Sequence, residues 1–475
     1  MSEDGQNPLK GEDAENDEPT RRMASVQLQA ALEEYCITID ALQELLELLT
    51  DPVVQDFDET LKKHLPLLLR VSNSASPSED EPDQLRTHLR ELASVILGRE
   101  LSEDDFERTV AGQIREGQGV QLSLSDNPWL DVQSLQTAVR RIQLAGRKAD
   151  FLNRSLFLTL TSAAEWVVHR SVEAFYKHAP SAATSDEKMF SLDHLRSLGS
   201  IDEAENFLIA KRVEKIMRGD VDKWIEWFEK ERDVGNTLGT RERLEVIEVF
   251  QRRHLLVHAG GRVDNIYLRK VDESLTTDLE IGTELPPTTA YLGRTLTLLE
   301  LAFVRLNAGL WRKILKDDDR RAVAFNNIAY DKLTDERYDA AKLLSSLAMQ
   351  DKHGGDDSKL VGQINYWLSY KLRGDFETVQ NEVANASFDT NSLRYKVPWL
   401  ALLDRHDEVF ALLPSAISSG ELGIGEIQQW LVFVWVRDDS RYGTFLARYP
   451  AGHGLVTDDP GLGTHEDVKD ANKDD

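Results

Sequence analysis

The sequence predicts an all-α protein with several helical regions. Apolar residues recur at spacings of three and four over most of the 475 residues, which is the period of an amphipathic helix. Extended structure is expected only briefly, within 117–130 and as a short hairpin within 266–285. The clearest helix, which begins near Glu242, ends at a Gly-Gly pair after His258.

Taken in order, the chain divides into five predicted regions. Residues 1–22 are acidic and without periodicity, which predicts a disordered tail. Residues 23–130 form an N-terminal helical region, with helices over 23–50, 57–71, 84–98 and 103–115 and a linker at 72–83. Two helices in 131–180, one or two in 201–233, the helix from Glu242 and a long helix near 288–315 fit a four-helix bundle over 131–315. Helical hairpins fill 316–450, and 451–475 is a flexible acidic tail.

Composition limits the classes of function. The net charge of −27 argues against non-specific nucleic-acid binding, which depends on Lys and Arg, so any RNA contact needs a local basic patch. Arginines around the helix that begins near Glu242 could supply that patch. Cys36 is the only cysteine, so an internal disulfide is impossible; its apolar helical setting indicates a core residue.

The hydropathy of the chain and the composition of its N-terminus bear on its location. No apolar run approaches the ~20 residues that span a bilayer, and the N-terminus is acidic and polar. We therefore expect a cytoplasmic protein with no membrane partner.

Arg253 is the residue in the helix from Glu242 that most needs explanation. The positions three and four residues away from it are Val249, Phe250, Leu256 and Val257, so the helix itself offers it no acid. Either another helix supplies a carboxylate, or the site receives an anion from outside. Arg252 differs, since Glu248 lies four residues before it and predicts an ordinary surface pair.

The segment Arg253-His254-Leu255-Leu256-Val257-His258 resembles the Arg-polar-x3-His pattern of the HEPN superfamily. The flanking text HLLVHAGGRVDNIYL and the upstream ENFLIAKRVEKIMRGDVDKWIEWFEK are also similar to that family. The resemblance covers roughly residues 150–315 and implies a helical bundle that forms a homodimer.

The resemblance implies a metal-independent endoribonuclease, of a defence or toxin kind, that needs no cofactor. The ribose 2′-hydroxyl would attack the adjacent phosphodiester and leave a cyclic phosphate. We expect His258 to transfer protons, Arg253 to stabilise phosphorane charge, and His254 to orient His258 or bind phosphate. Arg252 and Arg262 are expected to contact RNA. The alternative is a non-catalytic HEPN dimer that acts as a scaffold, regulator or nucleotide-binding module.

His254 and His258 also have the i, i+4 spacing of a helical metal pair. No third ligand is identifiable in the sequence, and the neighbouring Arg253 would disfavour a cation. No metal is expected at this site.

The C-terminal region contains an internal repeat. Residues 324–344 superpose on 362–382 with an offset of 38, which places Asn327 on Asn365 and Tyr338 on Phe376. A weaker third copy begins near Trp399. The pattern resembles tetratricopeptide-type hairpins, which implies a surface for a protein partner.

Overall fold

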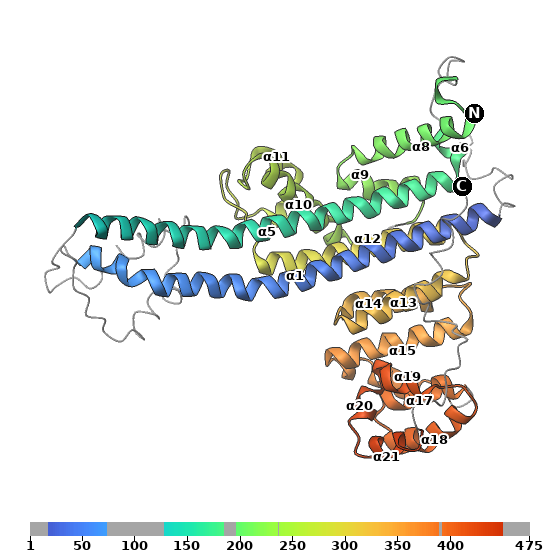
Figure 1. The fold of residues 1–475 in the computed structure, drawn as a ribbon. Helices are drawn as coiled ribbons and strands as arrows, with labels where there is room; N and C mark the ends of the chain where they lie inside the picture. The colour runs from blue at the N-terminus through green and yellow to red at the C-terminus, as the bar shows by residue number, and fades with distance from the viewer. Residues whose placement is uncertain (1–17, 74–127, 185–195, 236, 389–391, 450–475) are drawn as a thin grey trace. The chain divides into compact units, whose positions relative to one another are not determined.

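The computed structural model describes residues 18–73, 128–184, 196–235, 237–388 and 392–449 (Figure 1). These residues are mostly helical, so the predicted all-α class is confirmed. Among them, the only β-type pairing is an isolated antiparallel bridge between Arg262 and Glu284. No helix in the described ranges is long and apolar enough to cross a membrane.

The chain forms two compact units. Unit 1 takes the described residues up to Asp40, together with Ala163–Ile247 and those from Thr297 onward. Unit 2 takes the described residues of Ala41–Ser162 and of Glu248–Leu296. The two units differ from the predicted regions because compactness follows spatial contacts, which join distant segments of the chain.

The first helix differs from its prediction. Helix α1 spans Glu18–Asn73, so it begins inside the predicted tail 1–22 and replaces the two helices predicted over 23–50 and 57–71. Pro52 lies within it. A proline removes one backbone hydrogen bond and can bend a helix, but it need not end a long one. Three predictions lie wholly outside the described residues: the helices over 84–98 and 103–115 and the C-terminal tail 451–475. The predicted linker at 72–83 also lies outside them, apart from its first two residues, which belong to α1.

The second long helix also differs from its prediction. Helix α5 spans Pro128–His178 without a break, where two helices were expected, and the predicted boundary at 130/131 falls inside it. Its first residue is Pro128, a favoured first position because a helix leaves that N–H unbonded. The short helix α6, Pro180–Thr184, follows.

The helices predicted over 201–233 are present in unit 1. They are α8 (Ile201–Met217), α9 (Val221–Glu226) and the π-helical turn η2 (Trp227–Glu231). The Ser200 side chain accepts a hydrogen bond from the backbone of Glu203 and caps α8. Trp224, Trp227 and Phe228 are buried, as expected for core aromatic residues.

The predicted helix near Glu242 is α10, Thr240–His258, and the predicted long helix is α12, Thr289–Ile314. Between them, the predicted hairpin at 266–285 is absent. Helix α11 (Asn265–Lys270) and the 3-10 turn η3 (Glu273–Leu275) form there instead. The Asp264 side chain caps α11 by accepting from two backbone N–H groups, which favours a helix over an extended strand.

The C-terminal part of unit 1 is a series of helical hairpins. The left-handed residues Glu336, Gly374 and Asp404 each lie two positions before the second helical segment of a hairpin. The first two of these residues are separated by the 38 positions of the sequence repeat. The helical segments are α13 (Arg320–Thr334), α14 (Tyr338–Met349), α15 (Asp356–Arg373), η4 (Phe376–Thr378), α16 (Gln380–Asn385), α17 (Leu393–Leu402), α18 (His406–Ser418), α19 (Ile424–Gln429), η5 (Leu431–Phe433), α20 (Val434–Arg437) and α21 (Tyr442–Leu446).

A buried ion-pair network joins several helices of unit 1. Lys332 of α13 is fully buried, and its Nζ donates to both carboxylate oxygens of Asp40, at 2.5 and 2.6 Å, and to the Cys36 carbonyl. The same Nζ lies 2.9 Å from Glu300 Oε1, and Glu300 also pairs with Arg337. Burial alone would lower the pKa of Lys332, but the surrounding Cys36, Glu300 and Asp40 raise it, so the ammonium stays charged.

Cys36 itself is buried, as predicted. Burial raises the pKa of its thiol to about 12. Since the thiolate is the reactive form, Cys36 acts as a small core side chain and not as a nucleophile.

Candidate catalytic site at the end of helix α10

Helix α10 remains regular through His258 and then turns sharply. Gly260 and Gly261 have φ values of 63° and 83°, in the left-handed region that disfavours side chains. The Gly261 N–H donates to the Leu255 carbonyl at 3.0 Å and closes the turn. The predicted Gly-Gly helix stop is therefore confirmed, and it leaves His258 as the last helical residue.

A small apolar core holds this turn in place within unit 2. Leu255, Val263, Tyr267 and Val271 are buried together beneath the end of α10, the turn and α11. Backbone hydrogen bonds join Val263 to Thr283 and Gly282, so the chain returning from η3 is tied to the same turn. The position of His258 thus depends on contacts made after the helix ends.

Glu248 of α10 organises a buried polar network beside this core. Its Oε1 accepts from the Tyr267 hydroxyl and from Arg252 Nε, and its Oε2 accepts from the Tyr291 hydroxyl, each at 2.7 Å. The Arg252 guanidinium also lies 3.9 Å from the centre of the Tyr291 ring, a cation–π contact. Burial raises the pKa of both tyrosines, so their hydroxyls stay protonated and donate to the carboxylate.

We expect Glu248→Gln to destabilise unit 2 by about 2–4 kcal/mol, because a buried guanidinium loses its counter-ion and two hydroxyls lose a charged acceptor. Chemical unfolding followed by circular dichroism measures the loss. Glu245→Gln is the matched control, since Glu245 makes an exposed pair with Arg241 on the same helix and should cost less than about 1 kcal/mol. Equal effects of the two substitutions would contradict the role given to Glu248.

Arg252 differs from its prediction. The expected surface pair with Glu248 is present at 2.7 Å, but the two side chains are only 15% and 9% exposed. The reason is tertiary, because Tyr267 and Tyr291 cover the pair from elements that follow α10 in sequence. A guanidinium enclosed in this way is a structural group, and we leave Arg252 out of the RNA-contact surface proposed below.

The two histidines predicted to act together are in contact. His254 and His258 are both exposed, and their ring centres lie 4.6 Å apart with the planes inclined by 48°. Their spacing of one helical turn brings the rings together on one face of α10. A ligand can therefore reach both imidazoles at once.

Arg253 lies on a different face. Its side chain is half-buried and its Nε atom is fully buried. Because α10 stays helical to His258, Arg253 and His258 point about 140° apart around the helix axis. A single copy of the helix does not bring these two side chains onto one surface.

The remaining predicted residue, Arg262, lies just after the turn. It is exposed and pairs with Glu284, the residue with which it forms the isolated bridge. The sequence did not indicate Arg154 of α5, whose guanidinium lies about 4 Å from the position that a Cβ of Gly261 would occupy. Arg154 is about a hundred residues away in the chain, so no local pattern could have identified it.

The basic patch expected around α10 carries less excess charge than its composition suggests. Arg241 pairs with Glu245, and Arg243 pairs with both Asp222 and Glu229. Near the end of the helix, Arg154 pairs with Asp150 at 2.8 Å and Arg262 pairs with Glu284, so these two arginines are also partly neutralised.

The described residues contain no cluster of three or more His, Cys, Asp or Glu side chains arranged to hold a metal ion. Comparisons of the chain with protein-family models, curated proteins and solved structures give no match. Function must therefore be argued from the site itself.

Proposed function

We propose that this protein is a metal-independent endoribonuclease of the HEPN type. The observation that supports this best is the exposed His254–His258 pair at the end of α10, one residue from Arg253. Imidazoles can transfer protons near neutral pH, and a guanidinium can donate hydrogen bonds to two oxygens of one phosphate. RNA cleavage by its own 2′-hydroxyl needs these two kinds of group and no cofactor.

Each residue takes a specific part in the proposed reaction. The ribose 2′-oxygen bonds to phosphorus, its proton passes to His258, and the bond from phosphorus to the 5′-oxygen breaks. Arg253 stabilises the negative charge of the phosphorane. His254, in ring contact with His258, orients that imidazole or binds the phosphate. The leaving 5′-oxygen takes a proton from water, and the products are a 2′,3′-cyclic phosphate and a 5′-hydroxyl.

A shared site in a homodimer follows from the divergence of Arg253 and His258. Two copies related by a two-fold axis can place the arginine of one beside the histidine of the other. Val257 and Ile266, next to the site, remain 49% and 42% exposed, which favours an apolar contact between copies. Arg154 and Arg262 lie near the turn, and each would exchange its carboxylate partner, Asp150 or Glu284, for a phosphate of the RNA backbone.

The shared site predicts that activity returns when two inactive variants are combined. Arg253→Ala and His258→Ala should each be inactive as homodimers. After exchange of subunits, a heterodimer has both lesions in one cleft and an intact second cleft. We expect about half the wild-type rate per heterodimer under that model, measured with a fluorescent RNA in the presence of a chelator.

Two results would count against this assignment in different ways. If the mixture stays inactive although mass spectrometry detects heterodimers, Arg253 and His258 do not act across two chains. If a wild-type dimer cleaves none of a broad set of RNAs, the non-catalytic dimer that serves as scaffold or regulator becomes the better explanation. An active enzyme would fit a defence or toxin role, with the C-terminal hairpins receiving a protein partner.

A further inference from the structure

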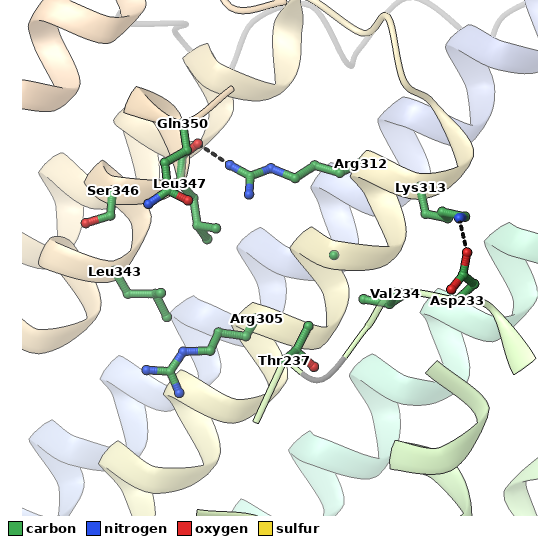
Figure 2. A pocket seen from close by; sticks show the side chains of 11 residues that line it. Asp233, Val234, Thr237, Arg305, Arg312, Lys313, Leu343, Ser346, Leu347 and Gln350 are labelled. Carbon is green, nitrogen blue, oxygen red and sulfur yellow. Dashed lines mark hydrogen bonds and ion pairs between the residues drawn. The ribbon is translucent and has the colours of Figure 1, made fainter. Parts of the chain in front are cut away.

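A cavity of about 450 Å³ lies within unit 1, and none of its lining residues belongs to the proposed catalytic site (Figure 2). Its two long walls are α12 and α14, and the connection after η2 closes one side. The lining residues are Asp233, Val234, Thr237, Arg305, Gly309, Arg312, Lys313, Leu343, Ser346, Leu347 and Gln350. Its size is within the range of small-molecule sites.

Helical spacing gathers three cations on the α12 wall. Arg312 and Lys313 follow Arg305 by seven and eight residues, which is about two helical turns, and Gly309 lies between them on the same side of the helix. Gly309 has no side chain to fill the space between the two arginines. A Cβ there would lie 2.3 Å from Val234 Cγ1, so the connection packs directly onto the helix backbone. Val234 therefore covers the helix backbone at Gly309, between the two arginines.

Arg312 is the central cation, and it extends across the cavity toward α14 (Figure 2). It donates to the Leu347 carbonyl and lies 3.9 Å from Asp351. Asp351 is already held by Arg321, at 2.5 and 3.1 Å, so one carboxylate serves two guanidinium groups. Burial lowers the pKa of Arg312; the charge of Asp351 opposes this shift, and the like charge of Arg321 adds to it. An added anion would relieve this excess charge.

The other two cations have carboxylate partners. Lys313 pairs with Asp233 at 2.5 Å, and Arg305 pairs with Glu242. Only Asp233 of these two acids lines the cavity, so the lining carries three cations against one acid. A positive cavity of this kind stands out in a chain with a net charge of −27.

We propose that this cavity binds a small phosphorylated metabolite, such as a nucleoside monophosphate or a sugar phosphate. Arg312 and Arg305 would bind the phosphate, since a guanidinium presents paired donors to two oxygens. Leu343, Leu347 and Val234 would contact the uncharged part of the ligand, and Ser346 and Gln350 supply hydrogen-bonding groups. The site is separate from the ribonuclease proposal and does not depend on it.

Isothermal titration of the full chain tests the site with four probes. We expect AMP and ribose 5-phosphate to bind, and adenosine, which lacks the phosphate, not to bind. Tighter binding of AMP than of ribose 5-phosphate identifies a nucleotide site, whereas equal binding identifies a sugar-phosphate site. Inorganic phosphate should bind more weakly than either, because it makes no apolar contacts.

Variants place the binding in the cavity. Arg312→Gln should weaken AMP or ribose 5-phosphate binding by about ten- to a hundredfold, the effect expected for a charge-assisted hydrogen bond. Ser346→Trp fills the cavity from α14 without changing its charge and should also prevent binding, so the test stands even if Arg312→Gln folds poorly. Arg218→Gln removes an equally charged but exposed arginine of unit 1 and should have no effect.

Three results would overturn the proposal. The first is that neither phosphorylated probe binds at millimolar concentration. The second is that Ser346→Trp binds as tightly as the wild type. The third is that Arg218→Gln and Arg312→Gln weaken binding equally, since that outcome indicates general charge attraction and not a defined site.

Discussion

His258→Ala should lower the rate of RNA cleavage by roughly 10²- to 10⁴-fold, the contribution of a positioned proton-transfer group. His258 is the last residue of α10 and is exposed beside His254. Alanine retains the helix and removes only the imidazole, so helical content should stay unchanged by circular dichroism. The rate is measured with purified protein and chelator, under single-turnover conditions.

His169→Ala is the matched control for this variant. His169 is an exposed histidine on the long helix α5, outside the proposed site, and its loss should leave cleavage at the wild-type rate. Cleavage by His258→Ala at the wild-type rate would remove this residue from the mechanism. Analysis of the product ends adds a second check, because a 3′-phosphate formed directly from water would exclude attack by the 2′-hydroxyl.

Lys332→Met should lower the free energy of unfolding of unit 1 by about 3–5 kcal/mol. Methionine keeps the length of the side chain but leaves Asp40 without its cation and Glu300 with only Arg337. Both carboxylates then remain away from water with part of their charge uncompensated. Urea unfolding followed by tryptophan fluorescence measures this change, because Trp311 and Trp367 are buried in the same unit.

Two comparisons separate the network from a general effect of losing a lysine. Lys359→Met removes a partly exposed lysine that lies 3.6 Å from Asp356, and it should cost less than about 0.5 kcal/mol. The double variant Lys332→Met/Asp40→Asn should be more stable than the sum of its single changes predicts, because it removes both partners of one pair. Strict additivity would show that Lys332 and Asp40 do not interact.

The sequence by itself was sufficient for features that depend on local periodicity and capping. The three- and four-residue spacing of apolar side chains identified α10 and α12 and predicted the all-α class. The Gly-Gly pair marked the end of α10, because few residues other than glycine adopt two successive left-handed conformations easily. The contact of His254 with His258 also follows from spacing on one helix, since residues four apart lie on the same face.

Sequence patterns were less reliable where a local signal is weak. The helices predicted over 23–50 and 57–71 imply a break between them, yet α1 continues through residues 51–56. A short hairpin was expected within 266–285, whereas the Asp264 cap and the burial of Tyr267 favour α11. In each case the energy of one local preference is small compared with that of the surrounding helix or core.

Only the tertiary structure decided which charged side chains are exposed and can bind a ligand. Arg252 and Arg262 look alike in the sequence, but Tyr267 and Tyr291 enclose Arg252 while Arg262 stays exposed. Arg154 reaches the α10 turn from a helix far away in the chain, and the cations of the Figure 2 cavity face a wall supplied by α14. Whether a charge is paired, buried or free to meet a ligand depends on contacts between distant segments, and helical periodicity carries no information about those contacts.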